Sequence, residues 1–330
     1  MRKNLSTAMA LLLSAALLPA CGNNAPTTTQ ASEPAEQAAT STAAQADDED
    51  YTTGDASLDN PRNADGIGKS ELMVVSFGTS YNDSRRQTIG AIEQSLEDAF
   101  PEWSVRRGFT SQIVIDHVKK RDGEVIDNVT QALKRASDNG VRTLVVQPTH
   151  LMHGFEYNDL SNELATYADA FDKIAIGEPL LSSDADFERV AQAVADATAS
   201  YDDGQTAIVL MGHGTEADSN SVYATMQNKF ASLGKTNYFV GTVEATPTID
   251  DILAAVKQGG YKRVVLEPLM IVAGDHANND MAGDDKDSWK SKFQAAGYEV
   301  ECILRGLGEL EPVQRLFVEH AQQAIDSLAK

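Results

Sequence analysis

The sequence predicts an α/β fold of two similar lobes, each a parallel sheet flanked by helices, with a cleft between the lobes. Three observations support this prediction. Apolar runs of strand length alternate with amphipathic segments of helix length along most of the 330-residue chain. Segments of the first half reappear in the second half in the same order. Polar side chains follow directly after several apolar runs, which is where the ligands of open α/β sheets bind.

The first 20 residues have the pattern of an export signal and are not expected to be part of the fold. Arg2 and Lys3 precede an apolar run over residues 8–18, which is short for a membrane span. The run ends in Leu-Pro-Ala-Cys, which resembles a bacterial lipobox with Cys21 as the lipidated residue. We therefore expect a lipid-anchored protein on the periplasmic side of the cell envelope, at the outer membrane if the cell has two. A plain secretory signal that happens to contain a cysteine is the alternative.

Residues 21–69 are predicted to form a disordered acidic tether, because they are rich in small and polar residues and have no apolar periodicity. The formal charge of −22 argues against a nucleic-acid partner and favours a cationic ligand such as a metal ion. Apart from Cys21 the chain has one cysteine, Cys302, so no intrachain disulfide is expected once Cys21 is lipidated.

The rest of the chain is long enough for an N-terminal lobe, residues 70–200, and a C-terminal lobe, residues 201–330. The predicted strands are residues 72–76, 104–108, 143–147 and 173–176 in the first lobe and 206–211, 238–241, 263–266 and 299–304 in the second. Helices are predicted at residues 85–100, 111–120, 124–139, 158–171, 186–199, 219–233, 248–258 and 287–296. Because strands and helices alternate, both sheets should be parallel and covered on both faces.

Three pairs of segments indicate an internal repeat. Residues 74–80 resemble 209–216, residues 109–116 resemble 243–250, and residues 147–159 resemble 267–279. In each pair one position lies at the end of a predicted strand: Phe77 corresponds to His213, Thr110 to Glu244, and Glu156 to His276.

The three strand ends of the second lobe carry two imidazoles and one carboxylate, which suggests a divalent-metal site. His213, Glu244 and His276 are about thirty residues apart, as successive βα units require. Two nitrogen donors and one oxygen donor leave positions open for water or substrate. Simpler roles are also compatible with the sequence, since His213 could cap the next helix and Glu244 could complement a helix dipole.

The other four histidines are weaker candidates. His117 and His320 lie in helical patterns without polar companions and are expected to be structural or solvent-facing. His150 and His153 follow a predicted strand, and the sequence leaves open whether either one lines the cleft.

The segments VVSFGTS, QPTHLMHGFEYND, VLMGHGTE, VEATPTIDDIL and EPLMIVAGDHANNDMAGDDKDSWK resemble those of the CbiK-type anaerobic cobaltochelatases. The resemblance covers about residues 71–325. It implies a chelatase fold and an enzyme of the lyase class that inserts a divalent metal, Co²⁺ or Fe²⁺, into the tetrapyrrole sirohydrochlorin, a step of cobalamin biosynthesis. It also implies that His213, Glu244 and His276 hold the metal and that His213 accepts a pyrrole proton. Glu156, the counterpart of His276, is a candidate second proton acceptor or a partner for an edge of the substrate.

The export signal keeps a second class of function open, because cobalamin is assembled in the cytoplasm. The alternative is a non-catalytic envelope lipoprotein of the same fold that binds haem, another tetrapyrrole or a metal. A periplasmic binding protein would also have two α/β lobes, but it does not need the three-ligand set. A homo-oligomer is compatible with each interpretation. If the ligand is a polycarboxylate tetrapyrrole, its acidic groups could meet Arg85, Arg86, Arg106 or Arg107.

Overall fold

A computed structural model of the chain describes residues 53–329. The predicted export signal, Cys21 and the first part of the predicted tether lie outside the described residues, so the expected lipid anchor stays a prediction. Within the described part of the chain, no helix combines the length and hydropathy that a membrane span requires.

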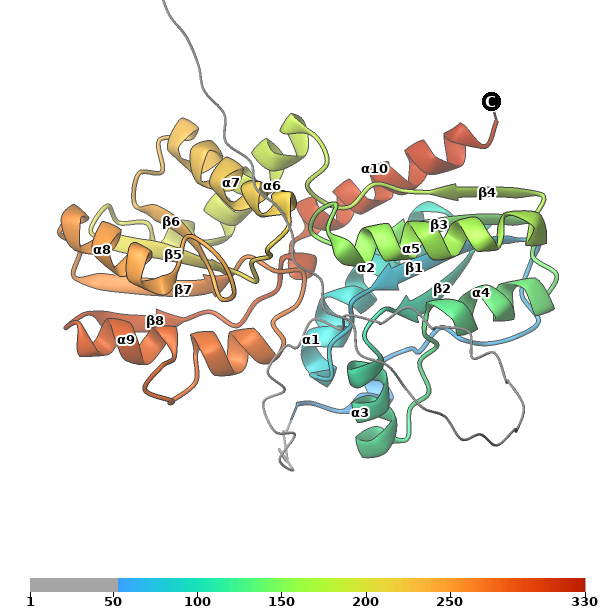
Figure 1. Cartoon of the computed structure of the whole chain (residues 1–330), viewed down its shortest axis with the longest axis horizontal. Helices are drawn as coiled ribbons and strands as arrows, with labels where there is room; N and C mark the ends of the chain where they lie inside the picture. The colour runs from blue at the N-terminus through green and yellow to red at the C-terminus, as the bar shows by residue number, and fades with distance from the viewer. Residues whose placement is uncertain (1–52, 330) are drawn as a thin grey trace, which may run out of the picture. The chain divides into compact units, whose positions relative to one another are not determined.

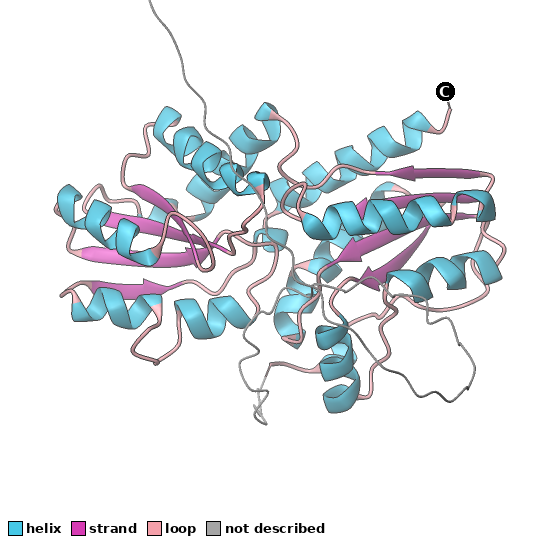
Figure 2. Ribbon diagram, viewed as in Figure 1, coloured by secondary structure: helices cyan, strands magenta, loops and turns pink. Residues whose placement is uncertain are grey.

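The described residues form two four-stranded parallel sheets with equivalent strand orders, β2-β1-β3-β4 and β6-β5-β7-β8 (Figure 1). The strands are β1 (Ser70–Ser76), β2 (Ser104–Phe109), β3 (Thr143–Pro148), β4 (Lys173–Ile176), β5 (Thr206–Gly212), β6 (Tyr238–Thr242), β7 (Arg263–Pro268) and β8 (Glu299–Cys302). The predicted strands agree with these bounds to within two residues at each end. The carboxyl ends of the two sheets point towards each other (Figure 2). The predicted fold class and the internal repeat are therefore confirmed.

Helices connect the strands and cover both sheets. They are α1 (Asn82–Gln87), α2 (Ile89–Ala99), α3 (Gln112–Asp122), α4 (Val129–Asp138), α5 (Phe155–Thr166), α6 (Asp184–Ala197), α7 (Ser221–Ser232), α8 (Ile249–Gly259), α9 (Trp289–Ala295) and α10 (Glu311–Ser327). Helix α10 is not among the helices predicted from the sequence.

Most of the predicted helices differ from the observed bounds by up to five residues at an end, and two of these differences have a clear local reason. The helix expected over residues 85–100 is divided at Thr88, whose hydroxyl donates to the Ser84 carbonyl (2.5 Å). Such a side-chain bond to the preceding turn competes with the regular helical pattern. The helix expected from residue 124 begins only at Val129, because Asn128 and Gln131 form a reciprocal capping box there.

Alternate residues of the central strands belong to different hydrophobic clusters. In β1, Leu72 lies in a cluster that also contains Ile208 of β5, whereas Met73 lies in a second cluster with residues of α4 and α5. In β5, Val209 lies in a third cluster with residues of α8 and α9. Because successive side chains of a strand point to opposite faces, the inner faces of the two sheets share one central core.

Helices also cross the expected boundary between residues 200 and 201. Helix α6 comes from the first half of the chain but packs against α7 of the second half. Helix α10 comes from the end of the chain but packs against α2, β3 and β4 of the first lobe (Figure 1). The predicted division into two lobes describes the sheets correctly, but the helical layer between them belongs to both.

Residues 53–69 correct the predicted extent of the tether. This N-terminal segment contains the short 3-10 helix η1 (Ala56–Leu58) and packs on the first lobe. Asp59 Oδ2 lies 2.6 Å from Arg85 Nε and 2.6 Å from Arg107 Nη1, and the carboxylate is almost fully buried. Burial alone would raise the pKa of Asp59, but the two guanidinium groups outweigh it and lower that pKa. The Asp59 carboxylate completes a buried ionic cluster with Arg85 and Arg107, and this contact orders the segment.

The same cluster decides the role of two candidate substrate arginines. Arg107 also pairs with Glu93 (2.7 Å) and Arg85 with Glu124 (2.8 Å), and neither arginine side chain is exposed. Both are therefore structural, and the expectation that either one meets substrate carboxylates is wrong.

Candidate metal centre

His213 lies in a Gly-His-Gly turn directly after β5. Gly214 has φ +91°, and a Cβ there would lie 2.8 Å from the Ala245 backbone nitrogen, so the turn requires glycine. Gly214 N donates to the buried Tyr223 hydroxyl (3.1 Å). His213 Nδ1 lies 2.8 Å from Gly214 O, which assigns the ring proton to Nδ1 and leaves Nε2 for a ligand. The helix that follows, α7, begins only at Ser221, so His213 is not its cap.

Glu244 follows β6 in the loop before α8. Its backbone N–H donates to the His213 carbonyl (2.8 Å), which holds this loop against the Gly-His-Gly turn. The N-terminus of α8 is capped by Thr248 and Asp251, so Glu244 is not used as a helix cap. One carboxylate oxygen of Glu244 lies 3.7 Å from His213 Nδ1, and about half of each side chain is exposed.

His276 lies in the loop after β7, at the start of the π-helix η5 (Ala277–Met281). Its Nδ1 lies 2.7 Å from Asp280 Oδ2. The hydrogen bond with Asp280 raises the pKa of His276, while burial acts in the opposite direction. Because Nδ1 donates to the carboxylate, Nε2 is left for a ligand. Asp280 was not predicted as a site residue from the sequence, although its spacing of four residues from His276 is visible in the segment AGDHANNDM.

The three predicted ligands form one cluster. One donor atom each from His213, Glu244 and His276 lies within 4.8 Å of the others. The two imidazole rings are edge-to-face, with centroids 4.7 Å apart and an interplanar angle of 81°. Two imidazole nitrogens and one carboxylate oxygen suit a first-row divalent ion. Since the side chains are 31–49% exposed, such an ion would keep open positions towards solvent or a second ligand.

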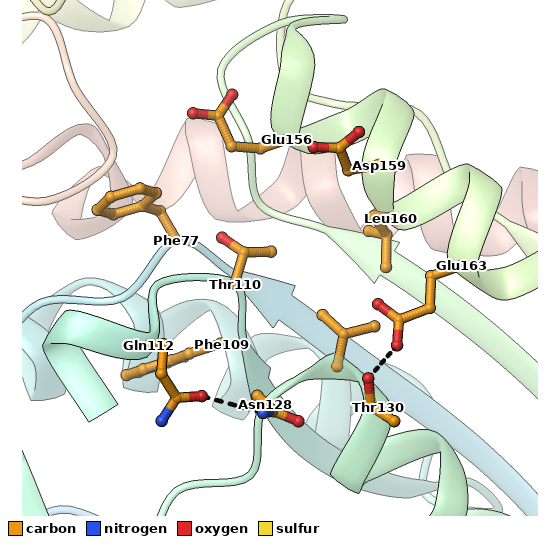
Figure 3. Close-up of a pocket in the computed structure, with 11 residues that line it drawn as sticks. Phe77, Phe109, Thr110, Gln112, Asn128, Thr130, Glu156, Asp159, Leu160 and Glu163 are labelled. Atoms are coloured by element: carbon orange, nitrogen blue, oxygen red, sulfur yellow. Dashed lines mark hydrogen bonds between the residues drawn. The ribbon is translucent and has the colours of Figure 1, made fainter. Parts of the chain in front are cut away.

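The corresponding positions of the first lobe do not form a metal site. Phe77, Thr110 and Glu156 line one end of a pocket of about 290 Å³ at the carboxyl edge of the first sheet (Figure 3). The pocket is nevertheless electrostatically connected to the second lobe. Burial is the main cause that raises the pKa of Tyr223, and the charge of Glu156 raises it further. The Tyr223 hydroxyl accepts a hydrogen bond from Gly214 N, in the turn that carries His213. Glu156 therefore lies on the side of the first lobe that faces the metal cluster.

His150 and His153 do not come together as a ligand pair. Only 9% of His150 is exposed, neither ring nitrogen has a hydrogen-bond partner among the described residues, and burial lowers its pKa to about 4. His153 Nε2 instead lies 2.7 Å from Glu178 Oε2. His320 is buried, with Nδ1 3.2 Å from Glu178 O and Nε2 3.4 Å from Asp186 Oδ1. The structural role expected for His320 is confirmed.

Comparison with known proteins gives a consistent result. The model of the cobalt chelatase (CbiK) family matches residues 70–326. A sirohydrochlorin cobaltochelatase of Salmonella typhimurium is 37% identical over 258 residues, which is 78% of this chain and 97% of the relative. The sirohydrochlorin cobaltochelatase CbiKC of Nitratidesulfovibrio vulgaris is 32% identical over 262 residues, 79% of this chain and 92% of the relative.

Among solved structures, SirB from Bacillus subtilis with Fe³⁺ has a similar fold. It superposes with a TM-score of 0.53 at 13% identity, and the match covers 80% of this chain and 98% of SirB. At this identity the likeness supports the two-lobed fold alone.

Proposed function

Because the chain belongs to the cobalt chelatase (CbiK) family, we propose that it inserts Co²⁺ into sirohydrochlorin, the substrate given in the names of both relatives. The observation that carries this proposal is the cluster of His213, Glu244 and His276, whose donor atoms lie within 4.8 Å of one another. A divalent cation also suits the strongly acidic chain, which has a formal charge of −22.

The proposed role of the cluster is to remove water from the incoming hydrated ion and to hold the ion for transfer to the macrocycle. Each imidazole or carboxylate donor replaces one water of the hydrated ion, while the remaining positions stay open for the pyrrole nitrogens. The carbonyl of Gly214 and the carboxylate of Asp280 fix the Nδ1 side of the two rings, so both can offer Nε2 without rearranging. The donor set also suits Fe²⁺, which we include as a second metal that the enzyme would accept.

Insertion must also remove two protons from the pyrrole nitrogens. We assign the first to His213: once the ion passes to the macrocycle, His213 Nε2 loses its bond to the metal and takes up a proton. We assign the second to Glu156, whose carboxylate comes from the facing lobe and borders the pocket with Phe77. Acceptors on opposite lobes would serve the two faces of a flat ring lying between them.

We propose further that the enzyme is exported and anchored through a lipid on Cys21. The basis is the sequence of residues 2–21, in which an apolar run ends at a lipobox-like cysteine. Cys21→Ala should move the protein from the membrane fraction to soluble or unprocessed fractions. Membrane association that still requires detergent in this variant would contradict the anchor.

The decisive experiment is a cobalt-insertion assay with sirohydrochlorin and the full-length chain, followed by the absorption change of the macrocycle. His213→Ala, Glu244→Ala and His276→Ala should each suppress insertion and weaken Co²⁺ binding. Their combined losses should be less than additive, because the three ligands act as one set.

His117→Ala, in the partly exposed region of α3, is the control and should retain activity. Wild-type-like Co²⁺ binding in folded His213→Ala and His276→Ala variants would contradict the assignment. Tight tetrapyrrole binding without insertion by the wild type would favour a binding protein.

A further inference from the structure

Phe77 is an exposed aromatic side chain at a position where the rest of the fold offers no reason for one. It follows β1 directly, 51% of it is exposed, and it borders the first-lobe pocket beside Thr110 and Glu156 (Figure 3). Its counterpart in the second lobe is the metal ligand His213. The same turn therefore presents an imidazole to the cluster in one lobe and a phenyl ring to the facing pocket in the other.

The backbone that carries Phe77 is held on both sides. Gly78 has φ +102° and Gly214 has φ +91°, so each of the two turns places a glycine in the left-handed region. A Cβ on Gly78 would lie 2.5 Å from the buried ring of Phe109. Ser111 N donates to the Phe77 carbonyl (3.2 Å). The phenyl ring therefore projects from a fixed turn, which lowers the entropy lost when a ligand packs on it.

The turn also touches the loop that carries His276. A Cβ on Gly274 would lie 3.1 Å from Thr79 Oγ1, and Ala273 N donates to Ser84 Oγ (3.1 Å). Val272, in the same loop, packs against the hydrophobic cluster that contains Phe109. Phe77 and the metal cluster therefore belong to two turns that are in direct contact across the lobes.

We propose that Phe77 is the stacking platform for one face of the tetrapyrrole, and that it determines how the ring is oriented over the metal cluster. This proposal rests on the proposed function. A conjugated macrocycle has two extended apolar faces, and an aromatic ring binds such a face by offset stacking. The pocket beyond Phe77 carries Glu156, Asp159 and Glu163. Their negative charges disfavour the carboxylate groups at the substrate's edge, so the ring must meet Phe77 with its face.

The test compares full-length wild type with Phe77→Ala and Phe77→Tyr in the insertion assay. Stacking is present both before and during insertion, so its loss should raise KM while kcat stays nearly constant. We expect KM for sirohydrochlorin to rise about tenfold in Phe77→Ala and to stay near the wild-type value in Phe77→Tyr, which keeps the ring. The visible absorption spectrum of bound Co²⁺ should be the same in all three proteins, because no metal ligand is changed.

Leu58→Ala is the matched control, because Leu58 is also an exposed large apolar residue (62%) but lies on the N-terminal segment. An unchanged KM in Phe77→Ala with an active wild type would overturn the proposal, even if the variant has lost the cobalt spectrum or changed its oligomeric state. If Phe77→Ala does not fold, Phe77→Leu replaces it, since leucine keeps the apolar volume without the aromatic face. If the wild type itself inserts no metal, the proposed function fails. Fluorescence titration of sirohydrochlorin then still decides whether Phe77→Ala weakens ring binding.

Discussion

Asp280 determines which nitrogen of His276 is available to a metal ion. Its carboxylate lies 2.7 Å from His276 Nδ1, within a π-helical turn that places the two side chains together. The Nδ1 of His213 is instead bound by the backbone carbonyl of its neighbour Gly214. No side-chain substitution removes that carbonyl. The two imidazoles of the proposed metal site therefore differ in how their orientation can be disturbed.

We expect Asp280→Ala to weaken Co²⁺ binding by about 10- to 100-fold, because the imidazole loses its partner and can rotate or change tautomer. The affinity is measured by titrating Co²⁺ and following its visible absorption. Asp284→Ala is the control, since Asp284 is fully exposed and pairs with Lys290 alone among residues 53–329. Equal affinities in the two variants would show that Asp280 has no orienting role.

Glu71 makes the stability of the fold depend on pH. It lies in β1 with 2% of its surface exposed, and burial raises its pKa to about 8 despite the opposing charges of Arg106 and Arg135. Between about pH 4.5 and about pH 8 the folded state therefore keeps a proton that the unfolded state has lost. In this window the free energy of unfolding falls as pH rises, by at most about 1.4 kcal/mol per pH unit from this group.

Glu71→Gln should remove this contribution, so the variant gains stability relative to wild type as the pH is raised through the window. Urea unfolding at several pH values measures the difference. Glu102→Gln, at an exposed position, should keep the wild-type pH dependence. If Glu71→Gln also keeps the wild-type pH dependence, the buried Glu71 carboxyl group is not its cause.

At the scale of elements, the buried carboxylate of Asp59 is one of the groups that hold the N-terminal segment of residues 53–69. Asp59→Ala would leave the buried guanidinium groups of Arg85 and Arg107 without a shared partner, so we expect the free energy of unfolding to fall by about 3–5 kcal/mol. Asp65→Ala, which removes a more exposed pair with Arg135 in the same segment, should lower the free energy of unfolding far less, because solvent screens this pair. Urea unfolding measures both. A loss for Asp59→Ala no larger than for Asp65→Ala would contradict the clamping role.

The elements that the sequence predicted well are those whose signals are local. Each central strand is buried on both faces, so it appears as a continuous apolar run with clear ends. His213 and His276 follow such ends, whereas Glu244 follows β6 at the edge of the second sheet. The ordered part of the tether was missed because its order depends on distant partners: Asp59 and Arg107 are 48 residues apart. The break at Thr88 depends on a single hydroxyl hydrogen bond, and apolar periodicity does not report it. Asp280 was within reach of the sequence, but its role becomes evident only when the rotamer of His276 is known.

At the scale of the whole molecule, the shared core should make the two lobes unfold together. The chain has two tryptophans, Trp103 beside β2 and Trp289 in α9, so Trp103→Phe and Trp289→Phe each leave a single fluorescent reporter in one lobe. We expect each variant to unfold in one transition in which its fluorescence midpoint coincides with that from far-UV circular dichroism. Separate transitions by the two methods would mean that the lobes are independent.

Cobalt should stabilise both lobes although its proposed ligands all come from the second. At a free Co²⁺ concentration about 100 times its Kd, the free energy of unfolding should rise by about 2.7 kcal/mol, whichever tryptophan reports it. Chelation of the metal should reverse the gain, and His276→Ala should abolish it. A shift seen only by Trp289 would show that the shared core does not couple the lobes.

The position of α10 has a consequence for the time at which the protein can fold. The helix that packs against β3 and β4 of the first sheet is formed by residues 311–327, which are translated after all the strands of both sheets. Domains commonly fold during synthesis as soon as their chain has emerged. Here the first sheet, although translated early, lacks part of its cover until the strands of the second sheet have also been translated. The first lobe therefore stays short of its native state until the second lobe has also been translated.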